Sequence, residues 1–213
     1  PTATPTVLGA IGTGAAATDA TRRDGVNYYG LETLNLSLGS GNDVLNVRGT
    51  LPVTNVFGGV GDDRVYISSL ADVGLADHPQ FLAGDLNAVA GTLNLDLGAG
   101  RHTLLISDEG TDVGDPNVLI TDVVAAARAR DAALSATGEI FVVGLAPAGI
   151  SYRADASGTF ADGIRIWSGS GADTIRVDGT HQRAGLRTTT WLNTGLGNDN
   201  VVVALTQGQD GFF

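Results

Sequence analysis

The chain has 213 residues, of which 43% are hydrophobic, so it is long enough and apolar enough to bury a core. Its formal net charge of −11 disfavours nucleic acid and anionic membrane surfaces as partners and attracts divalent cations. Cysteine is absent, which excludes disulfides and thiolate metal sites, and no apolar stretch is long enough for membrane insertion.

Residues 1–25 are rich in Ala, Thr and Gly, and we expect a linker or a weak first rung there. Residues 26–213 are expected to form a single domain, because one pattern recurs along them. Five copies align on paired glycines. In chain order they are LGSGNDVLNV (38–47), GGVGDDRVYI (58–67), LGAGRHTLLI (97–106), SGSGADTIRV (168–177) and TGLGNDNVVV (194–203).

Apolar residues occupy alternate positions on both sides of each glycine pair. A period of two is the signature of a β-strand, and paired glycines allow a tight turn between two strands. Each copy therefore predicts a strand, a turn and a second strand, and residues 48–52 would form the opposite turn. The apolar columns are Leu36, Val56, Leu95, Ile166 and Leu192 before the turn, then Leu45, Val65, Leu104, Ile175 and Val201, and finally Val47, Ile67, Ile106, Val177 and Val203.

The later copies are irregularly spaced, which indicates insertions, the main one around 108–138. Strand-like runs occur in Phe81–Val89 and Gly138–Tyr152, most clearly at Ile140–Val143. The alanine-rich segment 122–136 is compatible with a short amphipathic helix or with an irregular loop. We therefore expect an all-β fold, a parallel β-helix or β-roll-like solenoid with irregular insertions and one short helix near 122–136.

The five copies resemble the RTX nonapeptide, the haemolysin-type calcium-binding repeat of large exported bacterial proteins. The resemblance implies a parallel β-roll with calcium between the turns of adjacent rungs. It also implies carboxylate ligands at Asp43, Asp63, Asp173 and Asp199, paired as Asp43 with Asp63 and Asp173 with Asp199. Backbone ligands would come from Gly39, Gly41, Gly59, Gly61, Gly169, Gly171, Gly195 and Gly197.

Two features leave alternatives open. Only one turn per rung would carry the motif, which favours a one-sided calcium ladder or a β-helix that has lost most of its sites. An aspartate that follows a turn glycine can also simply cap the turn with its own side chain. In the third copy Arg101 and His102 replace the acidic pair. We expect no calcium there, and we expect Arg101 to pair with a neighbouring carboxylate.

The carboxylates Asp108, Glu109, Asp112 and Asp115 lie in one loop that would either bind another cation or be solvated surface, and we favour surface. His78, His102 and His181 are scattered without a nucleophile pattern, so we expect solvated histidines. No catalytic or cofactor-binding residue is predicted apart from the calcium ligands, and the sequence gives no basis for an enzyme.

The sequence therefore predicts a structural repeat module of a secreted or cell-surface bacterial protein, serving adhesion, extracellular matrix or a filament, and stabilised by calcium. Its partners would be itself or neighbouring modules, stacked head to tail. The alternative is a carbohydrate-binding or polysaccharide-modifying β-helix protein, with glycans as partners. Arginines would then line one face near Trp167 and Trp191, namely Arg153, Arg165, Arg176 and Arg187.

Overall fold

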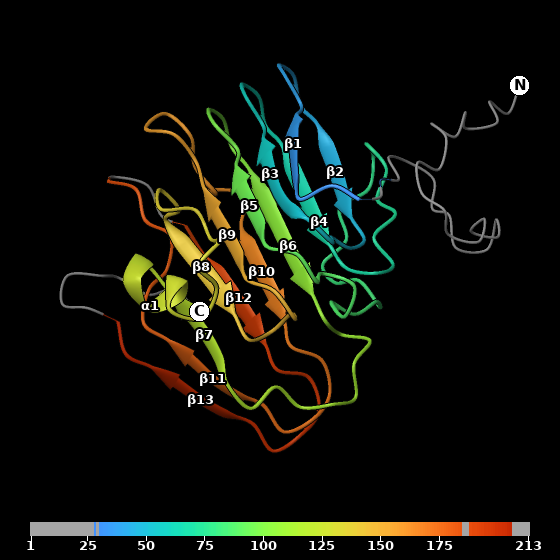
Figure 1. The fold of residues 1–213 in the computed structure, drawn as a ribbon, viewed down its shortest axis with the longest axis vertical. Helices are drawn as coiled ribbons and strands as arrows, with labels where there is room; N and C mark the ends of the chain where they lie inside the picture. The colour runs from blue at the N-terminus through green and yellow to red at the C-terminus, as the bar shows by residue number, and fades with distance from the viewer. Residues whose placement is uncertain (1–27, 29, 185–187, 206–213) are drawn as a thin grey trace, which may run out of the picture.

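A computed structural model describes residue 28 and residues 30–184 and 188–205, and Figure 1 shows the fold. The linker or first rung expected over 1–25 lies outside these residues. Strands account for 36% of the structure and helix for 3%. The strands form two sheets that are rich in parallel pairs. A nearly all-β fold with parallel strands, as the sequence predicts, is therefore confirmed.

The described residues form thirteen strands and one helix. The elements are β1 (Thr33–Ser37), β2 (Val44–Val47), β3 (Val53–Phe57), β4 (Arg64–Ile67), β5 (Leu93–Asp96), β6 (Thr103–Ser107), β7 (Val118–Thr121), α1 (Val124–Arg128), β8 (Ile140–Val143), β9 (Ile150–Arg153), β10 (Ile164–Trp167), β11 (Thr174–Val177), β12 (Thr190–Asn193) and β13 (Asn200–Val203).

Consecutive strands alternate between the two sheets, from β1 to β7 and again from β9 to β13. The eight-stranded sheet has the order β1-β3-β5-β9-β8-β7-β11-β13, and the five-stranded sheet has the order β12-β10-β6-β4-β2. In Figure 1 the strands follow one another from β1 and β2 in blue to β11 and β13 in orange and red. The pairs are parallel except where β8 meets β7 and β9. β8 interrupts the parallel order, and the two sheets are not closed into the β-helix or β-roll-like solenoid with irregular insertions that the sequence predicts.

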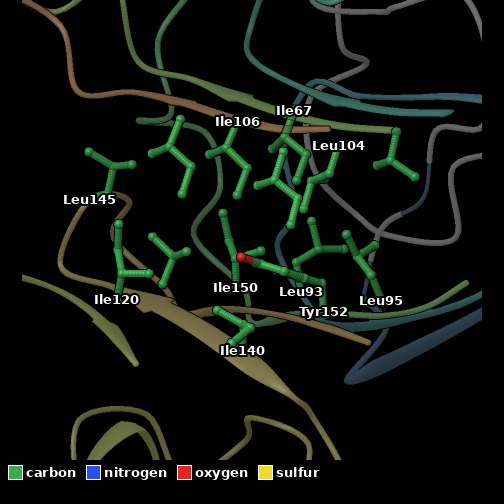
Figure 2. Packing of buried hydrophobic residues seen from close by; sticks show 14 of the residues in the cluster. Ile67, Leu93, Leu95, Leu104, Ile106, Ile120, Ile140, Leu145, Ile150 and Tyr152 are labelled. Carbon is green, nitrogen blue, oxygen red and sulfur yellow. The ribbon is translucent and has the colours of Figure 1, made fainter. Parts of the chain in front are cut away.

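The largest hydrophobic cluster of the described residues lies between the two sheets. Side chains alternate along each strand, so every second residue faces this core. Figure 2 shows Ile67, Leu104 and Ile106 of the five-stranded sheet opposite Leu93 and Leu95 of the eight-stranded sheet. The strand register confirms the period-two prediction, but the predicted columns hold only over the first three copies. Ile166 and Leu192 instead align with Ile106, and Ile175 and Val201 align with Val118. One column runs Leu36, Val56, Leu95 and Tyr152, and another runs Leu45, Val65, Leu104 and Ile164.

The insertion around 108–138 contributes β7 and α1 and leads into β8. The helix is a single short one, and its Ala127 packs in a small cluster with Phe141 of β8. The strand predicted at Ile140–Val143 is confirmed as β8. The strand-like run Phe81–Val89 is not a strand, and its only bridge joins Val89 to Thr50. Within that run Asp85 exchanges hydrogen bonds with Ser69, and such local bonds compete with strand pairing.

Candidate metal centres in two turn ladders

The glycine turns form two separate stacks. In the first three copies the turn leads from the eight-stranded sheet into the five-stranded sheet, and in the last two it leads back. The two sets therefore lie at opposite ends of the strands. We name them the first turn ladder (residues 38–43, 58–63, 97–102 and 154–159) and the second turn ladder (residues 110–115, 168–173 and 194–199). Of the two arrangements expected from the sequence, the one-sided ladder is wrong, and a β-helix that has lost most of its sites stays a prediction.

Stacking explains why glycine occurs twice in each turn. Gly59 has φ 98° and Gly61 has φ 147°, a conformation that other residues rarely adopt. A Cβ on Gly59 would also overlap the carbonyl oxygen of Gly39, and a Cβ on Gly61 would overlap that of Gly41. The amide of Val60 meanwhile donates to Gly39 O at 3.2 Å. Both glycines are therefore required by backbone conformation and by the close approach of the neighbouring turn.

The two carboxylate oxygens of Asp63 differ in their hydrogen bonding. Oδ1 of Asp63 accepts a hydrogen bond from the backbone N–H of Asp43 at 3.1 Å. Asp63 is fully buried, and Oδ2 of both Asp43 and Asp63 is buried with no hydrogen-bond partner. Burial raises the pKa of Asp63 above its ordinary value, against the opposing effect of the hydrogen bond from Asp43. One oxygen thus caps a neighbouring turn, while two buried oxygens stay unsatisfied.

His102 occupies the position of the aspartate in the third turn and makes the equivalent bond. Its Nδ1 accepts from the backbone N–H of Asp63 at 3.3 Å, and its Nε2 lies 3.2 Å from the carbonyl oxygen of Gly98. An acceptor at Nδ1 places the proton on Nε2, so the ring is neutral. The side chain is fully buried, which corrects the expectation of a solvated histidine. The turn therefore keeps its acceptor without a carboxylate.

A second column of side chains runs along the outside of the same ladder. Oδ1 of Asn42 accepts from the backbone N–H of Asp62, and Oδ1 of Asp62 accepts from that of Arg101, each at 2.8 Å. The guanidinium of Arg101 pairs with Asp162 at 2.6 Å. The prediction that Arg101 pairs with a neighbouring carboxylate is confirmed. These groups are exposed, so we assign them a positioning role within the turn.

The second turn ladder repeats the arrangement of the first. Oδ1 of Asp199 accepts from the backbone N–H of Asp173 at 3.0 Å, which confirms that these two predicted residues are neighbours. Oδ1 of Asp173 accepts in turn from the N–H of Asp115 at 2.7 Å, and its Oδ2 accepts from the hydroxyl of Ser168. Oδ2 of Asp115 is buried without a partner. Asp115 therefore belongs to the ladder, although the sequence favoured solvated surface.

The spacing of the sequence concealed Asp115. Asp173 precedes the core residue Ile175 by two positions, whereas Asp115 precedes the aligned Val118 by three. The extra residue, in the segment Pro116-Asn117, shifts the turn out of the repeat pattern. The glycine directly before Asp115 is the sequence feature that could have indicated a turn of the ladder. In the structure this residue, Gly114, stacks against Gly171 of the next turn.

Carboxylates gather beside the second turn ladder. Burial raises the pKa of Asp108 to about 7, and the charges of Asp115, Asp85 and Asp173 add to this effect. Burial and the charge of Asp173 raise the pKa of Asp115 to about 6. Asp108 is 4% exposed, so its expected place on solvated surface is also corrected. Folding brings these groups together at an electrostatic cost that a proton or a cation would relieve.

The ladders limit how calcium could be held. Among the described residues, no three Asp, Glu or His side chains converge as a metal site. Each pair of stacked turns therefore offers two carboxylates, and most of the six to eight oxygen ligands of calcium would have to be carbonyls and water. The carbonyls of Gly39 and Gly59 each accept one hydrogen bond from the next turn, which leaves a second lone pair on each. The turns are compatible with a weak cation site.

A further buried polar group lies outside the ladders. Arg183 holds both carboxylate oxygens of Glu139, at 2.7 and 3.0 Å, and Nε2 of His181 lies 3.2 Å from Oε2. Burial opposes ionisation of Glu139, but hydrogen bonds from His181 and Arg183 lower its pKa to about 2. His181 is 2% exposed, so the expectation of solvated histidines is wrong there too. This group joins the residue before β8 to the segment after β11.

The arginines expected on one face are divided between the sheets. Arg165 lies on β10 of the five-stranded sheet, with its guanidinium over the ring of Trp191. Arg153 and Arg176 lie on the eight-stranded sheet and pair with Asp96 and Asp178. Arg187 lies outside the described residues.

A comparison with protein-family models, with curated proteins and with solved structures finds no match to this chain. No helix in the described part of the chain has the length and apolar character that spanning a membrane requires. The role of the turns must therefore be argued from their own residues.

Proposed function

We propose that the chain is a structural repeat module of a secreted or cell-surface protein, with stacked turns of the RTX type that bind calcium. The observation that supports calcium best is the pair Asp43 and Asp63. Each presents a buried Oδ2 that has no hydrogen-bond partner. Unsatisfied buried carboxylate oxygens are costly, and a cation between the turns would satisfy both.

The same reasoning extends to the second turn ladder, where Asp115 shares the arrangement of Asp173 and Asp199. Calcium supplies positive charge there and draws its other ligands from turn carbonyls and water. A site with two carboxylates binds weakly, with a Kd on the order of 10⁻⁴–10⁻³ M, the range of extracellular modules. Calcium at that concentration is a reason to assign the protein to the outside of the cell.

The calcium proposal is tested by thermal unfolding in EDTA and in increasing calcium. At ten times its Kd, calcium stabilises by about 1.4 kcal/mol per site, which corresponds to a Tm rise of roughly 3–6 °C. Asp63→Asn keeps the Oδ1 acceptor for Asp43 and removes the charge. This variant should lose the part of the rise that comes from the first turn ladder.

Asp62→Asn is the matched control. Asp62 is the exposed neighbour of Asp63, and Asn42 already fills the equivalent position in the first turn. This variant should keep the full response to calcium. A wild-type Tm that is the same in EDTA and in 5 mM calcium would rule calcium out as a stabilising ligand.

We also propose that modules stack head to tail, as a filament, matrix or adhesive scaffold requires. The strands β12 and β13 lie at one end of the two sheets, and β1 and β2 lie at the other. On β13, Val201, Val202 and Val203 are 40%, 44% and 45% exposed. A strand edge with exposed valines favours the addition of another parallel rung.

Sedimentation velocity over a wide concentration range tests stacking. The wild type should sediment as a series of oligomers, and Val203→Lys on the β13 edge should reduce their population. Val113→Lys is the control, since Val113 is 70% exposed in a turn away from this edge. A single monomeric species at all concentrations would argue against head-to-tail assembly.

A further inference from the structure

A polar cleft lies on the outer face of the five-stranded sheet. It has a volume of about 440 Å³, within the range of small-molecule sites. Its floor comes from outward-facing residues of three neighbouring strands, namely Arg64 and Tyr66 on β4, Thr103 on β6 and Arg165 on β10. Residues in alternate positions on the same strands face the core, so packing holds the strands that carry the cleft.

One wall is a loop that the floor residues hold in place. The guanidinium of Arg64 donates to the carbonyl oxygens of Leu75 and Asp77, each at 2.6 Å. It also lies 3.3 Å from Nδ1 of His78. Further along, Nε1 of Trp167 donates to the carbonyl oxygen of Gln80 at 2.9 Å. The wall is therefore fixed by hydrogen bonds at two points.

Another wall carries the pair of Arg101, from the first turn ladder, and Asp162, which follows the last turn of that ladder. Both side chains are about half exposed, at 57% and 43%, so the pair is open to competition by a ligand anion. Arg165 stacks on Trp191 at 4.5 Å from the ring centroid, and the ion pairs of the described residues do not include it. Two arginines can thus offer N–H donors to a ligand.

The charge of the cleft is opposite to that of the molecule. Its lining holds three arginines against two aspartates, whereas the whole chain carries −11. A cleft with an excess of one positive charge favours a ligand group with one negative charge, such as a carboxylate. Two aspartates in the same lining would repel a phosphate, which carries more charge.

The remaining lining suits hydroxyl groups. Besides the guanidinium groups, the lining holds carboxylates, amides and a hydroxyl, at Asn42, Asp62, Gln80, Thr103 and Asp162. A sugar hydroxyl both donates and accepts, so it can bond to acidic and basic neighbours alike. We propose that the cleft binds a short acidic oligosaccharide, with the carboxylate of a uronate unit held by Arg165 and Arg101. This binding is independent of calcium in the turns and goes beyond the scaffold role.

Isothermal titration calorimetry of the full chain in EDTA tests the proposal, because the chelator removes calcium bridges between uronate and the turns. The probes are trisaccharides that carry a single uronate unit (galacturonate, glucuronate or mannuronate) beside two neutral units, with a galactose trimer as the neutral counterpart and inorganic phosphate as the plain anion. At least one uronate trisaccharide should bind, the neutral trimer should bind about tenfold more weakly or not at all, and phosphate should not compete.

Three variants locate the site. Arg165→Gln should weaken uronate binding about tenfold, since it removes a charged donor. Asp162→Asn should strengthen binding, because it frees Arg101 from its internal partner. Arg176→Gln, an exposed arginine on the other sheet, should leave the affinity unchanged, and circular dichroism checks the fold of each variant. Absence of binding by all three uronates, equal binding of the neutral trimer, competition by phosphate, or wild-type affinity in Arg165→Gln would each overturn the proposal.

Discussion

Oδ2 of Asp63 lies 3.7 Å from Nδ1 of His102, a contact that is an ion pair only when the imidazole is protonated. Nδ1 already accepts a hydrogen bond from the backbone N–H of Asp63. The imidazole therefore presents a lone pair, and the buried carboxylate gains no positive partner from it. This explains how the third turn can lose its aspartate and keep its shape, and why the charge of Asp63 needs a proton or a cation.

Replacement of His102 tests whether the hydrogen-bond acceptor at this position stabilises the fold. His102→Leu removes the acceptor for the Asp63 N–H and should cost about 1–3 kcal/mol of unfolding free energy. His102→Asn supplies an amide oxygen and should cost less. Chemical denaturation of both variants in EDTA checks the order, and equal losses would show that packing alone sets the effect.

His102→Asp should give the third turn a calcium response. In EDTA the added carboxylate lies beside Asp63, so repulsion should lower the Tm below that of the wild type. In calcium the new turn pair resembles Asp43 with Asp63, so the Tm rise should exceed the wild-type rise. An equal rise in the two proteins would contradict the assignment of calcium to stacked aspartates.

Alanine variants of two glycines with similar φ can distinguish the cost of backbone strain from the cost of disturbing the stacked turns. Gly39 has φ 100° and open space where a Cβ would lie, whereas Gly59 has φ 98° and faces the Gly39 carbonyl. Both Gly→Ala variants should lose about 1–2 kcal/mol from the positive φ. Gly59→Ala should lose about 1–3 kcal/mol more, because the neighbouring turn must move. Urea unfolding measures the difference, and equal losses would contradict close stacking.

Asp108 should make the calcium-free protein less stable as the pH rises. Its pKa is raised from 3.8 to about 7 in the folded state, so the folded protein binds the proton more tightly than the unfolded chain. The contribution is present below about pH 4 and is lost between about pH 4 and 7, by at most about 4 kcal/mol. Asp108→Asn keeps the acceptor for the Leu86 N–H and should flatten this part of the curve. Unfolding free energies of the wild type and Asp108→Asn, measured in EDTA from pH 4 to 7, check this prediction. Parallel dependence of the two proteins on pH would contradict it.

Ionisation of Glu139 should have the opposite effect on stability, which falls as the pH is lowered. The pKa of Glu139 is lowered from 4.5 to about 2, so its contribution is present above about pH 4.5 and is lost as the pH falls towards 2. The loss should be at most about 3 kcal/mol, reduced by solvent screening of the partly exposed group. Glu139→Gln should be less stable at pH 7 and lose less on acidification. A Gln variant with the wild-type acid profile would exclude Glu139 as the cause.

The sequence predicts the strands and turns well because both depend on local patterns. The columns through Leu36 and Leu45 follow from period two, and the turns follow from paired glycines. The division into two ladders could not be predicted, since a glycine turn looks the same whichever sheet it leaves. The segment between Gly98 and Gly169 contains β6, β7, α1, β8, β9 and β10, and the additional strands shift the motif from one end of the strands to the other.

The site was predicted in part for a similar reason. Asp43, Asp63, Asp173 and Asp199 do lie in stacked turns, because the repeat defines their positions. Asp115 and the buried role of His102 depend on contacts between rungs, which no spacing within one copy reveals. The cleft with Arg64 and Arg165 likewise depends on three strands that are distant in the sequence.

The placement of β1 and β13 at opposite ends of the eight-stranded sheet has a mechanical consequence. Tension applied between these strands acts along the direction of the inter-strand hydrogen bonds, so it loads the rungs in series. Such a stack yields by peeling one end strand at a time, at a lower force than shearing two sheets past each other would need. Each released rung of about twenty residues could lengthen the chain by roughly 60–70 Å, so the module would extend in steps under load.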